Sequence, residues 1–292
     1  MRILKGFAAI IAIVTATLLV YLPLSWWMLS LLWTKGEALS RLKRRMDKII
    51  LWWTGMNRRT FSALQLSKVE VVWHQKTDMD PNRWYLVICN HQTWTDIVLL
   101  QSHLYGTIPP LKFFTKEQLI WLPFIGIAMK VLGFPYVKRV TKSQIKANPM
   151  LRNADRDNVK IACDGFKNHP TSILNFVEGT RFTPEKHARQ RNEYQHLLRP
   201  KTGGLGYVLE NMDQHLHKLL DVTIIYPEGT PSFWDFLQGK CARVIIDVRP
   251  HDIPSSVLNV DEAERRIALG QWLKSLWLNK DLRLGERLQS DT

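Results

Sequence analysis

The chain has 292 residues, of which 46% are hydrophobic; this excludes a disordered polypeptide and allows a large buried core. Lysine and arginine number 40 against 26 aspartate and glutamate, so the net charge of +14 favours anionic partners such as nucleic acid, lipid headgroups or phosphorylated substrates. The 12 tryptophans favour a membrane among these partners, because the indole ring is amphipathic and suits the membrane interface.

The N-terminal segment is the first predicted element. Residues 6–33 contain no charged side chain, and this apolar run exceeds the about 20 residues that span a bilayer. Pro23 lies inside the run, which is therefore either one kinked helix or a shallow hairpin that does not cross; a buried soluble helix is the less favoured alternative. Basic residues from Lys35 onward place the rest of the chain in the cytoplasm by the positive-inside rule. We expect residues 1–34 to anchor the chain, in a bacterium at the inner membrane.

Residues 35–65 predict a basic amphipathic helix. Its apolar residues recur at spacings of three and four, with basic residues between them: Leu39, Leu42, Met46, Ile49 and Trp53. This pattern indicates a helix in the headgroup region with its apolar side toward lipid. A surface helix packed on the following domain fits the same pattern equally well.

From residue 66 to residue 250 the pattern alternates between strands and helices. We predict strands over 69–72, 84–89, 134–137, 172–177, 220–226 and 243–249. The predicted helices cover 96–104, 116–132 with a break near Pro123 and Gly126, 158–168 and 204–211. This alternation indicates an α/β domain with a mixed, largely parallel sheet flanked by helices.

Residues 251–292 predict a C-terminal helical extension. Asn259 is the expected cap, with Glu262 three residues later, and the helix continues to Leu288. Its apolar stripe, which includes Leu269 and Trp277, favours packing on the domain over contact with a membrane.

The first candidate for chemistry is the segment from Asn90 to Asp96. His91 follows an apolar strand, and Asp96 enters the first turn of the next helix. A turn between them brings the carboxylate onto the imidazole, which fixes the tautomer and leaves the other ring nitrogen free to accept a proton. The alternative is a helix-capping aspartate beside a structural histidine.

Two further segments offer charged groups at strand ends. Glu178 and Arg181 follow an apolar strand, where a charged pair is costly without a compensating partner. Arg181 and Arg139 each present a planar guanidinium suited to phosphate, and Lys138 precedes Arg139. The alternative in both segments is a solvated surface turn.

The order of these motifs resembles the glycerophospholipid acyltransferase family, whose best-known members are 1-acylglycerol-3-phosphate acyltransferases. The resemblance covers about residues 66–250 and ends with the strand that closes at Tyr226-Pro227. The segments 176–184, 197–204 and 231–236 are similar to a bacterial inner-membrane branch related to the lysocardiolipin acyltransferases. Val177 stands where the family more often has proline, so the substrate preference can differ from lysophosphatidate.

The resemblance implies a reaction and a set of site residues. His91 is implied as the general base and Asp96 as its orienting partner, with acyl-CoA or acyl carrier protein as co-substrate, a lysophospholipid as acceptor and no bound cofactor or metal. The implied substrate-binding residues are Lys116, Lys138, Arg139, Glu178, Gly179, Thr180 and Arg181. Glu178 is expected to order Arg181 and the loop, or to contact the glycerol backbone.

Two rival functions stay open from the sequence. A lipid or thioester hydrolase could use the same His-Asp pair, although no Gly-x-Ser-x-Gly motif is present. A basic membrane-anchored module that binds nucleic acid or anionic lipid fits the charge, although no nucleic-acid-binding motif is present. The three cysteines form no paired motif, so we expect buried, reduced thiols and no zinc site.

Overall fold

A six-stranded sheet lies at the centre of the molecule, in the strand order β1-β8-β7-β2-β6-β3. The structure, a computed structural model, describes residues 1–121, 125–137, 154–191 and 193–290. Neighbouring strands of this sheet are parallel except β7 and β8, so the predicted mixed, largely parallel α/β sheet is confirmed. The strands are β1 (Lys68–Trp73), β2 (Trp84–Cys89), β3 (Leu111–Phe113), β6 (Ser172–Asn175), β7 (Leu216–Ile225) and β8 (Arg243–His251).

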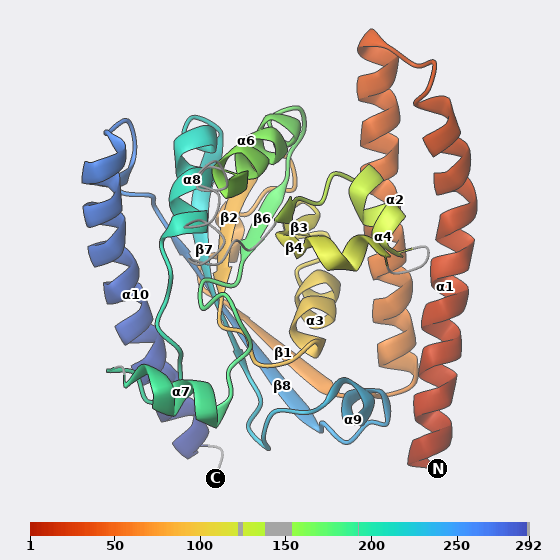
Figure 1. Cartoon of the computed structure of the whole chain (residues 1–292). Coiled ribbons are helices and arrows are strands. Elements are labelled where there is room, and N and C mark those ends of the chain that lie inside the picture. The colour runs from red at the N-terminus through yellow and green to blue at the C-terminus, as the bar shows by residue number, and fades with distance from the viewer. Residues whose placement is uncertain (122–124, 138–153, 192, 291–292) are drawn as a thin grey trace.

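Helices cover both faces of the sheet (Figure 1). Strand β2 shows why, because alternate side chains enter two cores: Tyr85 and Val87 lie in one, and Leu86 and Ile88 in the other. On the first face lie α3 (Thr95–His103) and α9 (Phe233–Leu237). The second face is covered by α6 (Ala154–Phe166), α8 (Gly203–Met212) and α10 (Glu262–Ser290).

Short elements form the part of the chain between β3 and β6. Of the predicted helix over 116–132, Lys116 belongs to a strand, residues 117–121 form a 3₁₀ helix and residues 125–131 form an α-helix. The strand begins one residue earlier, where the backbone N–H of Thr115 donates to Pro135 O at 2.8 Å. The elements are β4 (Thr115–Lys116), a 3₁₀ helix (Glu117–Trp121), α4 (Ile125–Val131) and β5 (Tyr136–Val137). Elsewhere the chain forms α7 (Pro184–Gln190) and two further 3₁₀ turns (Lys76–Asp78 and Ser255–Val257).

The N-terminal helices α1 (Arg2–Ser30) and α2 (Gly36–Ala63) form an antiparallel hairpin (Figure 1). Helix α1 continues through Pro23, so the chain reverses after the apolar segment and not within it. The indole N–H of Trp53 donates to Thr17 Oγ1 at 3.0 Å and ties the two helices together. Helix α1 is long and apolar enough to cross a membrane by length and composition.

The lipid-facing side predicted for α2 is buried instead. Leu42, Met46 and Ile49 pack against Val20 and Leu24 of α1. These three residues are therefore covered by α1, and the position of this helix at the headgroups of a membrane stays a prediction. Because α1 supplies an apolar surface alongside α2, the apolar stripe needs no lipid to cover it.

The other side of α1 presents apolar side chains to the surroundings. At its start, Gly6 lies so close to Trp234 of α9 that a Cβ would come within 2.9 Å of the ring. Further along, α1 packs on α2 and α4, so it lies against the rest of the molecule at both ends. Its exposed large side chains include Ile3, Leu4, Ile11, Val14, Leu18, Leu22, Trp26 and Leu29.

The C-terminal helix α10 packs on the second core, as its apolar stripe predicted, with Leu269 and Trp277 buried. The predicted cap is wrong. Asn259 has a left-handed backbone with φ +50°, and the side chain of Asp261 accepts from the N–H of Glu264 at 2.8 Å. Asp261 therefore caps this helix, because its carboxylate lies at the right distance from the first free N–H groups.

Candidate active site

Three neighbouring strands end at one edge of the sheet and bring distant motifs together. Strands β2, β6 and β7 run parallel. The first leads into His91, the second into Glu178 and Arg181, and the third into Tyr226. Open α/β sheets place ligands beyond the carboxyl ends of their strands, so this edge is the expected position of a site.

Asp96 is fully buried in the first turn of α3 and holds the groups around it. Its Oδ2 accepts from His91 Nδ1 at 2.8 Å and from the backbone N–H groups of Gln92 and Thr93 at 2.6 and 3.0 Å. The hydroxyl of Tyr226 donates to Oδ1 at 2.6 Å. A carboxylate at Nδ1 fixes a proton on that nitrogen and leaves Nε2 of His91 as the basic atom.

The imidazole of His91 is held from two further sides. Its ring stacks on Phe176 with centroids 4.0 Å apart and planes 20° from parallel. The backbone N–H of Phe182 donates to His91 O at 2.7 Å and links the loops after β2 and β6. The side chain is 14% exposed, so one edge remains open to a substrate.

Phe176 and Tyr226 are site residues that the sequence does not predict. No local spacing connects either residue with His91 or Asp96, because they lie on different strands. The one available signal was position: Tyr226 closes the strand next to β2, and Phe176 follows the strand on its other side.

Glu178 is a buried carboxyl that joins two loops. Its Oε2 accepts from the backbone N–H of His91 and its Oε1 from that of Leu198, both at 3.1 Å. Among the described residues it makes no ion pair with Arg181, so it orders the loop through backbone groups and not through that arginine. Burial raises the pKa of Glu178 to about 8 against the opposing effect of these two N–H donors.

This raised pKa gives the stability a pH dependence. Between about pH 4.5 and pH 8 the native Glu178 carboxyl holds a proton that the unfolded chain has lost. The contribution of this carboxyl to stability is therefore full below about pH 4.5 and is lost as pH rises through about 8. The free energy of unfolding of the parent falls across this range by a few kcal/mol relative to Glu178→Gln, since one pKa unit corresponds to about 1.4 kcal/mol. Denaturant titrations in detergent at several pH values measure this difference. A difference that stays constant with pH would mean that Glu178 titrates at its ordinary pKa.

A cavity of about 860 Å³, including its open mouth, lies in front of His91. The guanidinium of Arg181 lies 5.0 Å from the ring centre of Trp94, and Thr180 Oγ1 accepts from Lys186 Nζ at 2.8 Å. The lining includes the predicted residues His91, Gly179, Thr180 and Arg181, together with Trp94, Ile97, Phe113, Phe114, Thr115, Leu119, Leu174, Asn175 and Phe176.

The other predicted substrate-binding residues do not line this cavity in the described part of the chain. Lys116 follows Thr115 of the cavity wall and ends β4, where its backbone is described. Lys138 and Arg139 lie outside the described residues. Glu178 is buried behind the loop and does not line the cavity.

Comparison with known protein families decides the identity of this domain. The family model named Acyltransferase matches residues 70–225. The chain belongs to the acyltransferase family. This stretch contains the His91–Asp96 pair, the loop after β6 and strand β7.

Relatives of this chain come from several organisms. It is 24% identical to lysocardiolipin acyltransferase 1 of Gallus gallus, over 80% of this chain and 63% of the relative. It is 23% identical to 1-acyl-sn-glycerol-3-phosphate acyltransferase 2 of Brassica oleracea, over 84% of this chain and 59% of the relative. The chain thus spans about three fifths of the length of these relatives.

A solved structure supports the fold of the chain. The crystal structure of the 1-acyl-sn-glycerophosphate acyltransferase PlsC from Thermotoga maritima superposes with a TM-score of 0.52 at 19% identity. The match covers 94% of this chain and 97% of that one. The similarity therefore extends beyond the domain matched by the family model.

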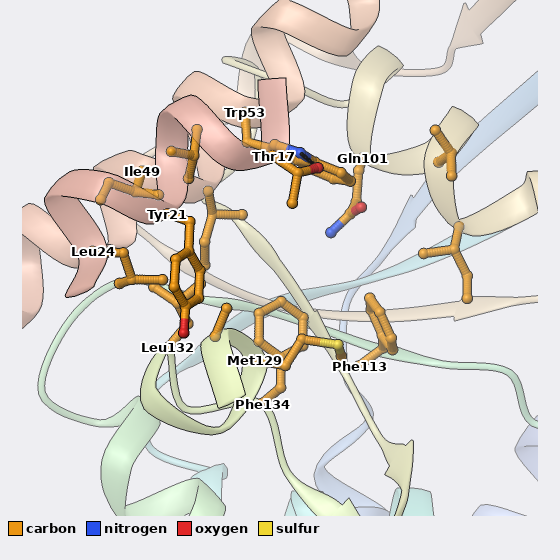
Figure 2. A pocket seen from close by; sticks show the side chains of 15 residues that line it. Thr17, Tyr21, Leu24, Ile49, Trp53, Gln101, Phe113, Met129, Leu132 and Phe134 are labelled. Carbon is orange, nitrogen blue, oxygen red and sulfur yellow. Dashed lines mark hydrogen bonds between the residues drawn. The ribbon is translucent and has the colours of Figure 1, made fainter. Parts of the chain in front are cut away.

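A second, apolar cavity of about 830 Å³, including its open mouth, lies between the α1–α2 hairpin and the acyltransferase domain. Ile97 and Phe113 line both this cavity and the one at His91. Figure 2 shows Tyr21, Met129, Phe113 and Phe134 around its open centre. The lining is almost wholly apolar, and Gln101 and Thr17 are among its few polar side chains.

The three cysteines are buried and free, as predicted. Cys89 ends β2 beneath the site, and burial raises the pKa of its thiol, as it does for Cys163 and Cys241. A protonated thiol is a poor nucleophile, so His91 has no thiolate partner here. Within the described ranges, no three His, Cys, Asp or Glu side chains are grouped so that they could hold a metal ion.

Proposed function

We propose that this chain transfers a fatty acyl group from a thioester donor, acyl-CoA or acyl carrier protein, to the free hydroxyl of a lysophospholipid. The observation that carries the proposal is the buried Asp96 that orients His91 at the mouth of a cavity. The names of the relatives share acyl transfer to a lysophospholipid and differ in the headgroup.

In this proposal His91 Nε2 removes the proton from the acceptor hydroxyl as its oxygen attacks the thioester carbonyl. The carbon–oxygen bond forms, the tetrahedral intermediate collapses, and the carbon–sulfur bond breaks. The imidazolium then returns its proton to the leaving thiolate. Asp96 stabilises the imidazolium, and Tyr226 together with the N–H groups of Gln92 and Thr93 holds the side chain of Asp96 in position by hydrogen bonds.

The cations near the cavity are proposed to bind the phosphate of the acceptor. Arg181 lines the cavity, and its planar guanidinium suits a phosphate group. Lys116, Lys138 and Arg139 keep the same proposed role. The net charge of +14 would also concentrate an anionic donor near the site.

The apolar cavity is proposed to hold a fatty acyl chain. It borders the His91 cavity at Ile97 and Phe113, so a chain can extend into it from the reacting carbonyl. Each methylene buried there contributes about 0.8 kcal/mol to binding, which gives the chain length an influence on affinity.

Filling this cavity shortens the preferred acyl chain. Met129→Trp places a larger ring among Phe113 and Phe134, so long chains lose room while short ones still fit. We expect kcat/KM for a 16-carbon donor to fall about 10-fold or more relative to an 8-carbon donor, because roughly two lost methylene contacts suffice for that change. Met129→Leu, which keeps the volume, is the matched control. Equal losses for both donors would contradict the assignment.

The N-terminal hairpin is proposed to hold the enzyme along one leaflet of a membrane. The exposed apolar side of α1 would enter the lipid, while α2 beside it carries exposed cations that avoid the hydrocarbon. These exposed cations are Arg41, Lys43, Arg44, Arg45 and Lys48. We propose the bacterial inner membrane, with the catalytic domain on the cytoplasmic side.

The test uses the full chain in detergent with labelled acyl-CoA or acyl carrier protein and a panel of lysophospholipids. Labelled diacyl phospholipid supports the proposal, and the preferred acceptor and donor identify the substrates. Labelled free fatty acid alone would indicate a hydrolase. No product from any pair would remove acyl transfer as the function.

A further inference from the structure

The segment 197–204 has no role in the mechanism above, yet it lies beside the catalytic loop. The backbone N–H of Lys201 donates to Val177 O at 2.8 Å, and the N–H of Leu198 donates to Glu178. These two bonds fix the segment along the loop that follows β6. Lys201 therefore reaches the site from a different part of the chain than Arg181.

The side chain of Lys201 passes directly over Gly179, which lines the active-site cavity. A Cβ at Gly179 would lie 3.2 Å from Lys201 Nζ and 3.4 Å from its Cδ. Gly179 also has φ +70°, a conformation that other residues rarely adopt. The positive φ favours glycine in this turn, and the lysine ammonium lies against Gly179 at the rim of the cavity.

Three cations surround this short loop, and none of them forms an ion pair with another of the described residues. Lys186 Nζ donates to Thr180 Oγ1 and to the carbonyl of Arg181, both neutral acceptors. The guanidinium of Arg181 lies on Trp94, and neither it nor the exposed Lys201 meets a carboxylate within the described part of the chain. Like charges held together without a counter-charge repel one another, and a bound anion relieves the repulsion.

The start of α8 adds backbone donors at the same place. The helix begins at Gly203, two residues after Lys201, and the side chain of Thr202 does not cap it. A Cβ at Gly204 would lie 3.3 Å from Nδ2 of Asn175, a residue of the cavity wall. The free N–H groups of this first turn thus lie close to the cavity, where they favour an anion further.

We propose that Lys201 is a phosphate-binding residue at the rim of the active-site cavity, acting with Arg181 on a phosphate group of the substrate. This inference rests on the proposed acyl transfer. The phosphate belongs either to the headgroup of the lysophospholipid or to the donor, and both sources share the chemistry of a phosphate dianion or diester held by an ammonium and a guanidinium.

The test compares Lys201→Met with the parent, because methionine keeps the packing on Gly179 and removes only the charge. Lys201→Arg restores a cation, and Lys76→Met at the exposed turn far along the chain is the matched control for loss of charge. KM and kcat are measured separately with 1-acylglycerol 3-phosphate and with acyl-CoA, and the melting temperature is recorded for each variant.

We expect Lys201→Met to raise KM about 10-fold for one substrate, with kcat and melting temperature nearly unchanged and with recovery in Lys201→Arg. A raised KM for the acceptor assigns the phosphate to the lysophospholipid, and a raised KM for acyl-CoA assigns it to the donor. Values equal to those of Lys76→Met would overturn the role of Lys201. So would a fall in kcat and melting temperature that arginine does not restore. If the parent forms no acylated product, the proposed acyl transfer itself is contradicted. This outcome is distinct from the outcomes that concern Lys201.

Discussion

Replacing His91 with alanine lowers the rate of acyl transfer by about 10²- to 10⁴-fold, the range that a general base contributes. The imidazole is the basic group that Asp96 orients at the cavity, and no buried thiol can replace it. Because alanine keeps the backbone N–H that donates to Glu178, the loop stays in place and KM for the acceptor changes little. Initial rates with labelled acyl-CoA and a lysophospholipid measure the effect.

The control for this experiment is His217→Ala, at the opposite end of β7, which contacts Arg83 and not the cavity. It should leave the rate within about two-fold, as is usual for substitutions away from a site. A His91→Ala variant as active as this control would remove His91 as the base and, with it, the mechanism proposed for the cavity.

Replacing Asp96 with alanine is expected to damage both activity and stability. The change leaves His91 Nδ1, the N–H groups of Gln92 and Thr93, and the Tyr226 hydroxyl without their acceptor in a fully buried position. Removing one partner from a buried group of hydrogen-bonded side chains of this kind lowers the free energy of unfolding by about 3–5 kcal/mol. The transfer rate falls about 10²- to 10⁴-fold as well, since His91 loses its tautomer and orientation.

Tyr226→Phe separates the two effects of Asp96, because it removes one hydrogen bond and keeps the His91–Asp96 contact. We expect a loss of about 1–3 kcal/mol in the free energy of unfolding and a rate within about 10-fold of the parent. Denaturant titration and initial rates of both variants give the comparison. If Asp96→Ala is destabilised but transfers acyl groups as fast as Tyr226→Phe, Asp96 has a structural role only.

The local patterns of the sequence were sufficient for the fold class and for the central pair of residues. Alternating apolar segments identified the strands and helices of a mixed sheet, because burial on a strand or helix repeats with a short, regular period. The His91–Asp96 contact also follows from local spacing, since one turn separates the two residues. Local patterns were less reliable where a neighbour decides the outcome: the apolar side of α2 is covered by α1, and Asp261 replaces Asn259 as the cap of α10.

Only the tertiary structure decided which distant groups complete the site. Tyr226 reaches Asp96, Glu178 joins His91 to Leu198, and Lys201 passes over Gly179, because β6 and β7 both lie beside β2 in the sheet. Strand order is set by packing over the whole domain and not by spacing along the chain. The sequence by itself therefore determined the net positive charge, the apolar N-terminal segment, the α/β fold class and the contact between His91 and Asp96. The order of the strands determined that Tyr226, Glu178 and Lys201 lie around the His91–Asp96 pair.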